Sequence, residues 1–254
     1  RQARALEPAL SPGLRLALEL PGDHAVDPRA LTATLADAVV RAGGALCEGA
    51  EVARVECGND RVRAVALAGG RRVACEQVVM AAGAWSRQIA GLPPGAQVPL
   101  RPVKGQILRL HDPSGPGLLS RVLRLEDAYV VPRGDGRYVL GATVEERGFD
   151  LSVTAGAVAG LLREATELLP GLSELVIDEL AAGLRPGTPD NAPIIGPGAV
   201  SGLHWATGHY RAGVLLAPVT ATLVAGMLAG AEPEIDLSPF AAGRFAGSAL
   251  GAAR

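Results

Sequence analysis

The chain is poor in lysine and in aromatic residues. Lys104 is its only lysine, and all its other side-chain cations are arginines. Aromatic residues make up only 3% of the chain whereas apolar residues make up 48%, so any core must be built from Ala, Leu and Val. The formal net charge of -2 excludes the strongly basic character of nucleic-acid-binding and membrane-surface proteins. Because arginine is abundant throughout, an arginine indicates function only by its position.

Cysteine is also scarce. The three residues, Cys47, Cys57 and Cys75, are odd in number and match no zinc-binding spacing. We interpret them as reduced, small apolar side chains and expect a cytoplasmic protein. We expect no signal peptide at the start of the chain. Because the first residue is Arg1 and not Met, we expect an N-terminal truncation.

Several catalytic motifs are missing. The four histidines accompany no Gly-x-Ser-x-Gly nucleophile elbow, and no His/Asp cluster has metal-ligand spacing. The adjacent Glu145 and Glu146 are typical of a solvated turn. The chain contains neither a Walker loop nor a Gly-x-Gly-x-x-Gly loop after a first strand. These absences argue against a hydrolase, a metalloenzyme and a complete nucleotide-binding domain.

The first hundred residues predict mixed helix and strand. The alternating run Leu14–Leu20 predicts a strand, and Asp27-Pro28 predicts the start of a helix. Short strands follow between residues 51 and 75, separated by glycine-containing turns. The apolar run 77–83 predicts a strand buried on both faces, and Trp85 is predicted to begin a helix.

The residues that follow predict a different arrangement of secondary structure. Consecutive hairpins between residues 102 and 142 indicate an antiparallel sheet. Thr154–Leu169 predicts an amphipathic helix that ends before Pro170-Gly171, and Leu175–Leu184 predicts a strand. The length of 254 residues and this change of pattern predict two interwoven domains of the α/β plus α+β class.

The stretch from Gly183 to Ala231 organises the rest. Arg185 and Arg211 stand on glycine-punctuated backbone, where a guanidinium can hold an anion in a fixed pose. The apolar segment 212–231 is about long enough to span a bilayer, but Pro218 and its small residues favour a buried helix and no integral membrane segment. Its start leaves backbone N–H groups free for an anion or a polarised carbonyl.

Seven motifs in order resemble the FAD-dependent amino-acid oxidases of the D-amino-acid oxidase superfamily. The pattern is most similar to that of the glycine oxidases of thiamine biosynthesis, and the resemblance covers nearly the whole chain. Each motif is weak alone, and their order and spacing carry the resemblance. They are Ala81–Ser86, Pro102–Gln106, Tyr129–Arg133, Gly141–Thr143, Gly183–Pro186, Thr188–Asp190 and Gly208–Pro218.

The resemblance implies a partial, Rossmann-like FAD-binding domain interleaved with an antiparallel-sheet substrate domain. Residues 1–25 and 99–183 would belong to the substrate domain, and residues 26–98 and 184–254 to the FAD-binding domain. The implied activity is oxidative deamination of a small amino acid similar to glycine or sarcosine. A hydride passes from the α-carbon to the flavin, the released imine is hydrolysed to a keto acid and ammonia, and oxygen reoxidises the flavin to give peroxide.

The resemblance also implies roles for individual residues. Arg185 would grip the substrate carboxylate, Tyr129 would place its hydroxyl over the substrate, and Arg211 would lie at the flavin and substrate face. Without the resemblance, Arg185 is a surface arginine in a Pro-Gly turn and Tyr129 an aromatic packed on a sheet. No residue is assigned as a catalytic acid or base, because this chemistry needs orientation and electrostatics. The implied FAD contacts are Val52, Gly83, Trp85, His209, Tyr210, Arg211, Ala212, Gly213, Val214 and Leu215.

The front of the chain departs from the family. The nucleotide-binding βαβ unit with its Gly-x-Gly-x-x-Gly is missing, a unit on the order of a hundred residues. We therefore expect residues 1–254 alone to bind little FAD. Two alternatives stay open: a D-amino-acid dehydrogenase or another amine oxidase of the superfamily, and a non-catalytic fragment. Association into a homo-oligomer also stays open.

Overall fold

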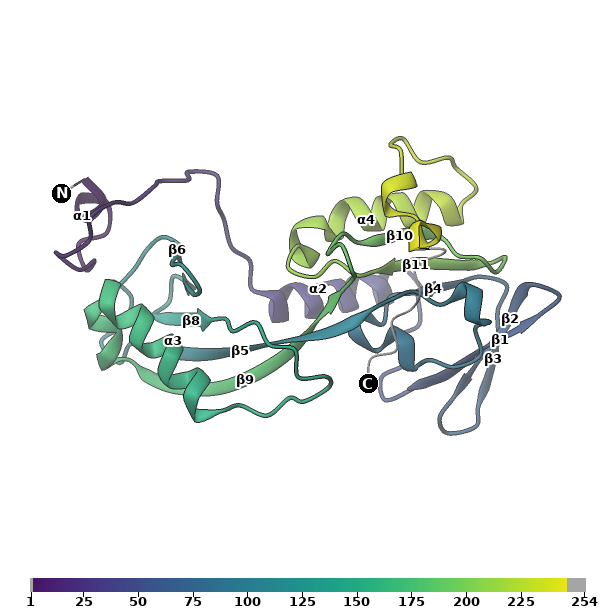
Figure 1. The fold of residues 1–254 in the computed structure, drawn as a ribbon, viewed down its shortest axis with the longest axis horizontal. Coiled ribbons are helices and arrows are strands. Elements are labelled where there is room, and N and C mark those ends of the chain that lie inside the picture. The colour runs from purple at the N-terminus through teal and green to yellow at the C-terminus, as the bar shows by residue number, and fades with distance from the viewer. Residues whose placement is uncertain (1, 246–254) are drawn as a thin grey trace. The chain divides into compact units, whose positions relative to one another are not determined.

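The computed structural model describes residues 2–245. The chain forms two compact units (Figure 1). Unit 1 comprises residues 1–42 and 104–184, and unit 2 comprises residues 43–103 and 185–254. The chain passes between the units three times: between residues 42 and 43, within the long strand β5 (Arg101–His111), and within the long strand β9 (Val176–Gly187). The predicted mixed architecture of two interwoven parts is confirmed.

Unit 1 is built on a five-stranded sheet of order β6-β7-β8-β5-β9. Antiparallel pairs join the first four strands, as the consecutive hairpins predict. Helix α3, capped at its start by the Thr154 hydroxyl, packs on one face. Leu108, Leu140 and Leu161 belong to the core between them. The bounds are β6 (Leu123–Arg124), β7 (Tyr129–Pro132), β8 (Arg137–Gly141) and α3 (Ala155–Leu168).

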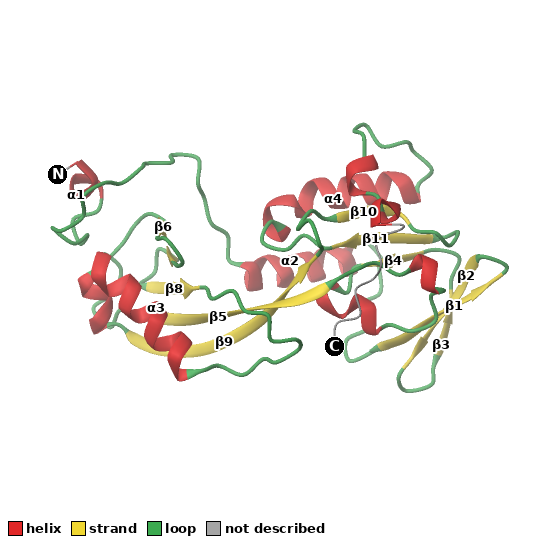
Figure 2. Cartoon of the chain, viewed as in Figure 1, coloured by secondary structure: helices red, strands yellow, loops and turns green. Residues whose placement is uncertain are grey.

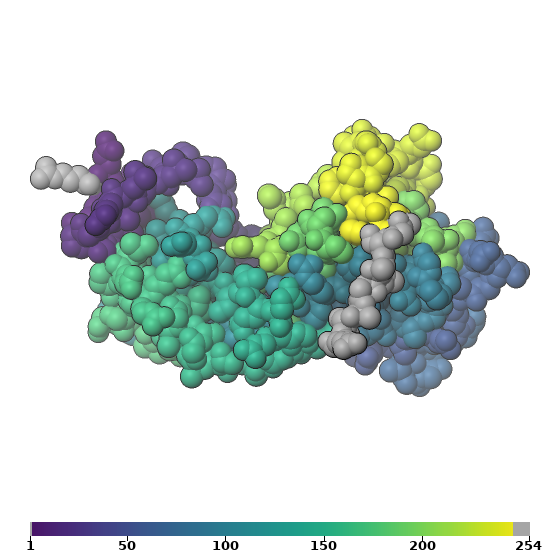
Figure 3. All heavy atoms as spheres, viewed as in Figure 1, coloured from purple at the N-terminus to yellow at the C-terminus, as the bar shows by residue number. Residues whose placement is uncertain are grey.

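The predicted strand at Leu14–Leu20 is wrong. Between α1 (Gln2–Leu6) and α2 (Pro28–Arg41) the chain is an irregular loop, drawn green in Figure 2. Leu16 and Leu18 are 88% and 83% exposed, and the segment forms a thin arch in the space-filling view (Figure 3). Alternation makes a strand only where a neighbouring strand accepts its hydrogen bonds, and no described strand pairs with it.

Ion pairs and hydrogen bonds explain why α2 belongs to unit 1. The Asp27 carboxylate accepts hydrogen bonds from the first N–H groups of the helix, as predicted. The Arg29 guanidinium forms a bidentate pair with Glu179 of β9, with N–O distances of 2.9 and 2.6 Å, and Arg133 donates to the Val26 carbonyl. Residues 26–42 fall in the same compact unit as residues 104–184. The bounds of the FAD-binding domain segment, residues 26–98, stay a prediction.

Unit 2 contains two three-stranded sheets and one long helix. One sheet is antiparallel, β1-β2-β3, and the other has the order β10-β11-β4 with β11 and β4 parallel. Val55, Val62, Met80, Leu203 and Trp205 belong to one buried cluster to which both sheets contribute. The bounds are β1 (Val52–Gly58), β2 (Arg61–Leu67), β3 (Arg72–Ala74), β4 (Val78–Met80), β10 (Ile194–Pro197), β11 (Leu203–Thr207) and α4 (Gly213–Leu228).

Two local predictions in unit 2 need correction. The apolar run 77–83 forms only the three-residue strand β4, which is the edge strand of its sheet. The prediction that this strand is buried on both faces is wrong, because Val79 is 37% exposed. The helix predicted to begin at Trp85 is a six-residue 3₁₀ helix, and it begins two residues earlier, at Gly83. The short 3₁₀ helices are η1 (Gly83–Gln88), η2 (Pro94–Ala96), η3 (Pro170–Glu174), η4 (Ser238–Phe240) and η5 (Ala242–Phe245).

Candidate active site

The carboxyl ends of two parallel strands meet at one edge of unit 2. Residues Leu203–Trp205 of β11 lie alongside Val78–Met80 of β4 in parallel register. The hydroxyl of Thr207, the last residue of β11, donates to the Gly83 carbonyl just after β4 at 3.4 Å, although the two residues are 124 positions apart. The predicted cofactor residues Gly83 and His209 therefore follow neighbouring strand ends, which is where open α/β sheets bind ligands.

The turn between β11 and α4 has an unusual backbone. Gly208 and Tyr210 have φ values of +77° and +49°, both in the left-handed region. A Cβ on Gly208 would lie 2.7 Å from the Thr188 Cγ2, so glycine is needed here for both dihedral angle and space. Tyr210 is a non-glycine residue in this region, a conformation that costs about 1 kcal/mol or more and is concentrated at functional sites.

Helix α4 begins at this turn without a side-chain cap. The residue before it is Ala212, and among residues 2–245 no side chain caps its first turn with a hydrogen bond. The leading N–H groups of a helix lack intrahelical partners and carry a partial positive charge. The side chains of Val214 and Leu215 are 52% and 80% exposed here. An uncapped positive helix end beside exposed apolar side chains fits a planar aromatic group with an electron-rich edge, such as a flavin ring.

Arg185 lies on a segment that contacts this turn. It stands near the end of β9 and is half-buried. The next residue, Pro186, accepts a hydrogen bond through its carbonyl from the Tyr210 N–H at 3.1 Å. The structure therefore brings the Arg185 segment together with the segment that carries Arg211. Arg211 itself is exposed.

His209 joins the turn to the helix that follows. Its Nε2 lies 2.9 Å from the Thr220 Oγ1 on α4. Burial lowers the pKa of the His209 imidazole, because a buried site disfavours the charged form. His209 is therefore a neutral hydrogen-bonding group near pH 7, and it contributes no second cation beside Arg211.

A polar network that the sequence reasoning missed supports the site. The Thr188 carbonyl accepts from the Arg101 guanidinium, and the Thr188 hydroxyl lies 3.0 Å from an Asp190 carboxylate oxygen. Arg244 donates to Asp190 at 2.9 Å. The hydrogen bond from Arg244 is the main reason that the pKa of Asp190 lies at about 2. The Thr188-Pro-Asp190 motif was the one signal of this network in the sequence.

The remaining predicted residues lie elsewhere. Val52 is the first residue of β1 and is half-buried, and Trp85 in η1 is 44% exposed. Tyr129 opens β7 in unit 1, where its ring lies against Gly141 of β8. Gly83, Arg185 and the residues from His209 to Leu215 are thus joined through adjacent contacts, whereas Val52 belongs to the other sheet of unit 2.

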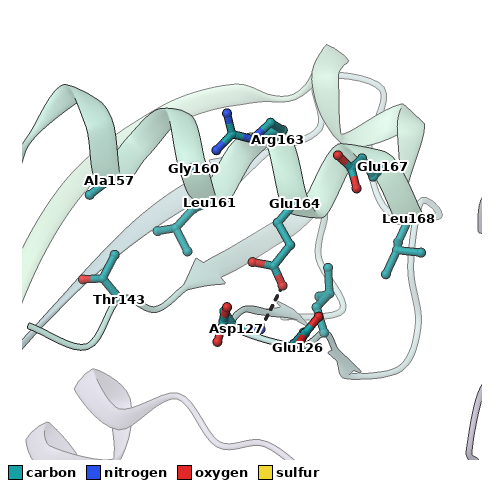
Figure 4. A pocket seen from close by; sticks show the side chains of 11 residues that line it. Glu126, Asp127, Thr143, Ala157, Gly160, Leu161, Arg163, Glu164, Glu167 and Leu168 are labelled. Atoms are coloured by element: carbon teal, nitrogen blue, oxygen red, sulfur yellow. Dashed lines mark hydrogen bonds between the residues drawn. The ribbon is translucent and has the colours of Figure 1, made fainter.

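A separate pocket of about 560 Å³ lies on unit 1 beside α3. Its rim carries the carboxylates of Glu126, Asp127, Glu164 and Glu167 around apolar side chains. Figure 4 shows these side chains, and its dashed line is the hydrogen bond from the Asp127 N–H to Glu164 at 3.0 Å. None of the predicted site residues lines this pocket, and its negative rim is unsuited to a substrate carboxylate.

Residues 2–245 contain neither a cluster of metal-binding side chains nor a helix that could cross a membrane. Over residues 2–245, no three His, Cys, Asp or Glu side chains gather in a way that could hold a metal ion. Within the same range, none of the helices combines the length and apolar character needed to cross a bilayer. The apolar segment 212–231 contains the 16-residue helix α4. The prediction that this helix is buried is wrong, because only its residues Thr220 and Val224 are buried and Leu215 is 80% exposed.

Comparison with known proteins gives consistent matches. Residues 1–227 match the family model described as FAD dependent oxidoreductase. The chain is 35% identical over 245 residues to the hydrogen cyanide synthase subunit HcnC of Pseudomonas aeruginosa, covering 96% of this chain and 58% of that protein. It is 38% identical over 246 residues to a glycine oxidase of the same organism, covering 96% and 66%.

A solved structure agrees with these sequence matches. The crystal structure of glycine oxidase from Geobacillus kaustophilus superposes with a TM-score of 0.87 at 35% identity, covering 94% of this chain and 64% of that one. The chain thus spans between 58% and 66% of the length of these three proteins.

Proposed function

Because the chain belongs to the FAD dependent oxidoreductase family, we propose that it forms the substrate and flavin-ring part of an enzyme that oxidises a small amino acid. The proposed reaction is the oxidative deamination of a glycine-like or sarcosine-like amine, with molecular oxygen as the electron acceptor. FAD, when bound, supplies the group that accepts the two electrons. The residues of this chain bind and orient the substrate, and they set the electrostatic potential around the flavin ring.

One observation carries the proposal. The hydrogen bond from the Tyr210 N–H to the Pro186 carbonyl holds the Arg185 segment against the turn that opens α4. A guanidinium that can grip a carboxylate and an uncapped helix N-terminus are thereby carried on adjoining segments. A small amino acid oxidised by a flavin needs both features, since its carboxylate must be fixed while its α-carbon faces the ring.

Each residue has a defined part in this proposal. Arg185 binds the substrate carboxylate, and Arg211 with the backbone N–H groups of residues 212–215 raises the potential at the flavin ring. Gly83 and Trp85 follow β4 and would lie near the dinucleotide. Tyr129 and Val52 keep the roles that the resemblance implies, at the substrate and at the adenine.

The names of the relatives favour two physiological settings. Glycine oxidase and bifunctional ThiO/ThiG relatives support a contribution to thiamine biosynthesis, which we propose as the first setting. The relative called a hydrogen cyanide synthase subunit supports a second setting, in which the chain acts within a multi-subunit enzyme. A cytoplasmic location and assembly into a homo-oligomer remain predictions.

Flavin binding tests the proposal directly. We would purify residues 1–254 and, separately, the same chain preceded by the upstream sequence that its gene encodes, and record the visible absorption of bound flavin. We expect flavin in the longer protein and little in residues 1–254. A folded, colourless longer protein would refute the proposal.

Substitution of Arg185 tests the substrate contact. Loss of a charge-assisted bidentate contact is worth about 1.5–3 kcal/mol, so Arg185→Ala should raise the KM for glycine about 10- to 100-fold while flavin stays bound. Arg185→Lys should restore little of the lost substrate affinity, because an ammonium group cannot form the two parallel hydrogen bonds that a guanidinium makes with a carboxylate. Arg71→Ala, in an exposed turn of the same unit, is the control. An unchanged KM in Arg185→Ala removes Arg185 from the site.

A further inference from the structure

Gly141 lies in β8 between two larger side chains. In the antiparallel register, Tyr129 of β7 stands opposite Gly141 on one side, and Ile107 of β5 stands opposite it on the other. Their sequence neighbours Val130, Leu140 and Leu108 are fully buried in the core shared with α3. Because side chains alternate along a strand, Tyr129, Gly141 and Ile107 share the opposite face of the sheet.

The tyrosine ring occupies the space that a side chain at position 141 would need. A Cβ built on Gly141 would lie 2.8 Å from the Tyr129 Oη and 2.9 Å from its Cζ. The same Cβ would lie 2.7 Å from the Ile107 Cγ2. The phenol end of Tyr129 therefore crosses β8 over the glycine and ends beside Ile107.

The backbone of Gly141 does not itself demand glycine. Gly141 is not among the residues with positive φ, so alanine could adopt its conformation. In such a position, replacing glycine by alanine ordinarily stabilises a protein by about 0.4–1 kcal/mol. The reason for glycine is thus the space above it, and that space holds Tyr129 and Ile107.

We propose that Gly141 is a positioning residue for Tyr129: its missing side chain lets the phenol lie flat across β8 and so fixes where the hydroxyl points. The proposal rests on the proposed function only in assigning that hydroxyl to the substrate. A methyl group at position 141 must displace a side chain, because the strand is held by hydrogen-bonded neighbours on both sides and by the buried core on its other face. Tyr129 and Ile107 are both half-buried and are the groups able to move.

The first experiment detects the ring without any cofactor. The chain has only three tyrosines, so ring-labelled tyrosine gives few NMR signals. In residues 1–254 we expect nuclear Overhauser effects from the Tyr129 ring to the Gly141 Hα and to the Ile107 methyl. In Gly141→Ala the effect to the Ile107 methyl should be lost. Gly183→Ala, at a strand glycine with open space around it, should leave the effect intact.

A second variant, Ile107→Ala, keeps the test valid if Gly141→Ala does not fold. Ile107→Ala removes the wall against which the phenol ends, without adding any atom to β8. We expect the Tyr129 ring signals to shift and to broaden as the ring gains freedom. The proposal is overturned if Gly141→Ala keeps the nuclear Overhauser effect from the Tyr129 ring to the Ile107 methyl, or if the Tyr129 ring signals in Ile107→Ala are the same as in the wild type.

Kinetics on the flavin-bound enzyme separate this inference from the proposed function. If Gly141 acts through the hydroxyl, Gly141→Ala and Tyr129→Phe should lower kcat/KM by similar factors. Adding Gly141→Ala to Tyr129→Phe should then change kcat/KM by less than about twofold, well short of additivity. If the Tyr129 ring moves in Gly141→Ala but kcat/KM is unchanged, the proposed role of Tyr129 at the substrate is refuted and its positioning by Gly141 is not. If the effects of the two substitutions on kcat/KM are additive, the positioning of Tyr129 by Gly141 is contradicted.

Discussion

Gly208→Ala should destabilise unit 2 for two separable reasons. Gly208 has a φ of +77° and directly precedes the segment that bears His209 and Arg211. Alanine at this dihedral angle is strained, and its Cβ would also lie 2.7 Å from the Thr188 Cγ2 and 3.4 Å from the Ile194 nitrogen. Gly230, which follows α4, offers a matched control, because it has a φ of +84° and nothing lies within 4 Å of the position that an alanine methyl would take.

The magnitudes follow from these surroundings. A left-handed dihedral angle costs a non-glycine residue about 1–2 kcal/mol, and this is the whole expected cost of Gly230→Ala. Gly208→Ala adds overpacking in a buried site, which costs about 1–3 kcal/mol more. We therefore expect a loss of about 2–5 kcal/mol in the free energy of unfolding for Gly208→Ala.

Tryptophan fluorescence during urea unfolding provides the assay. Both tryptophans, Trp85 and Trp205, lie in unit 2, so their emission reports on the unit that contains both glycines. The double variant Gly208→Ala/Thr188→Ser removes the methyl group that the new Cβ meets but keeps the hydroxyl of residue 188 and its hydrogen bonds. Its stability should return close to that of Gly230→Ala, once the cost of Thr188→Ser alone is subtracted.

Two results would refute this reasoning. Equal losses in Gly208→Ala and Gly230→Ala would mean that the contact with Thr188 carries no cost. Failure of Thr188→Ser to recover stability would mean that the loss arises from another part of the turn.

Three further predictions concern single side chains. Amine-reactive labelling followed by mass spectrometry should leave the fully buried Lys104 unmodified in the native chain and modify it in urea. Asp150→Asn removes the carboxylate that lies 2.7 Å from the Lys104 Nζ, so it should speed the labelling of Lys104 in the native state. Burial lowers the pKa of His209 below its ordinary 6.5, so near this pH the unfolded chain binds more protons than the folded chain. The free energy of unfolding should therefore fall as the pH drops below about 6.5. His209→Gln should weaken that pH dependence in the tryptophan assay. Because the pKa of Asp190 lies at about 2, its carboxylate stabilises the folded state above about pH 4, and this stabilisation should be lost as the pH falls toward 2; Arg244→Met should flatten the pH dependence in that range.

Local signals in the sequence predicted local structure well. Asp27-Pro28 begins α2 because a capping carboxylate and a proline act within one helical turn. Asn59 and Asp60 turn β1 into β2 with φ values of +53° each, which short polar side chains tolerate. The Leu14–Leu20 alternation failed because a strand depends on a partner that no local pattern reveals.

In the candidate site, too, features with a local signal could be predicted and features that depend on a distant partner could not. Gly83 and Gly208 could be placed at strand ends, since glycines after apolar runs mark where the chain turns. Arg101 could not be found, because its partner Thr188 is 87 positions away and arginines are common throughout the chain. The hydrogen bond between Tyr210 and Pro186 also escaped prediction, since a backbone group of any residue type could have formed it.

The passage of the chain from unit 2 into unit 1 and back has a consequence for biosynthesis. On the ribosome, β4 is made long before β11, and the contact between Gly83 and Thr207 spans 124 residues. Residues 104–184 can fold into their sheet during that interval, while β4 lacks its only described neighbour in the sheet. Pairing over such separations is slow and leaves strand edges open meanwhile. In the nascent chain, β4 therefore stays without its partner β11 until translation has passed Thr207.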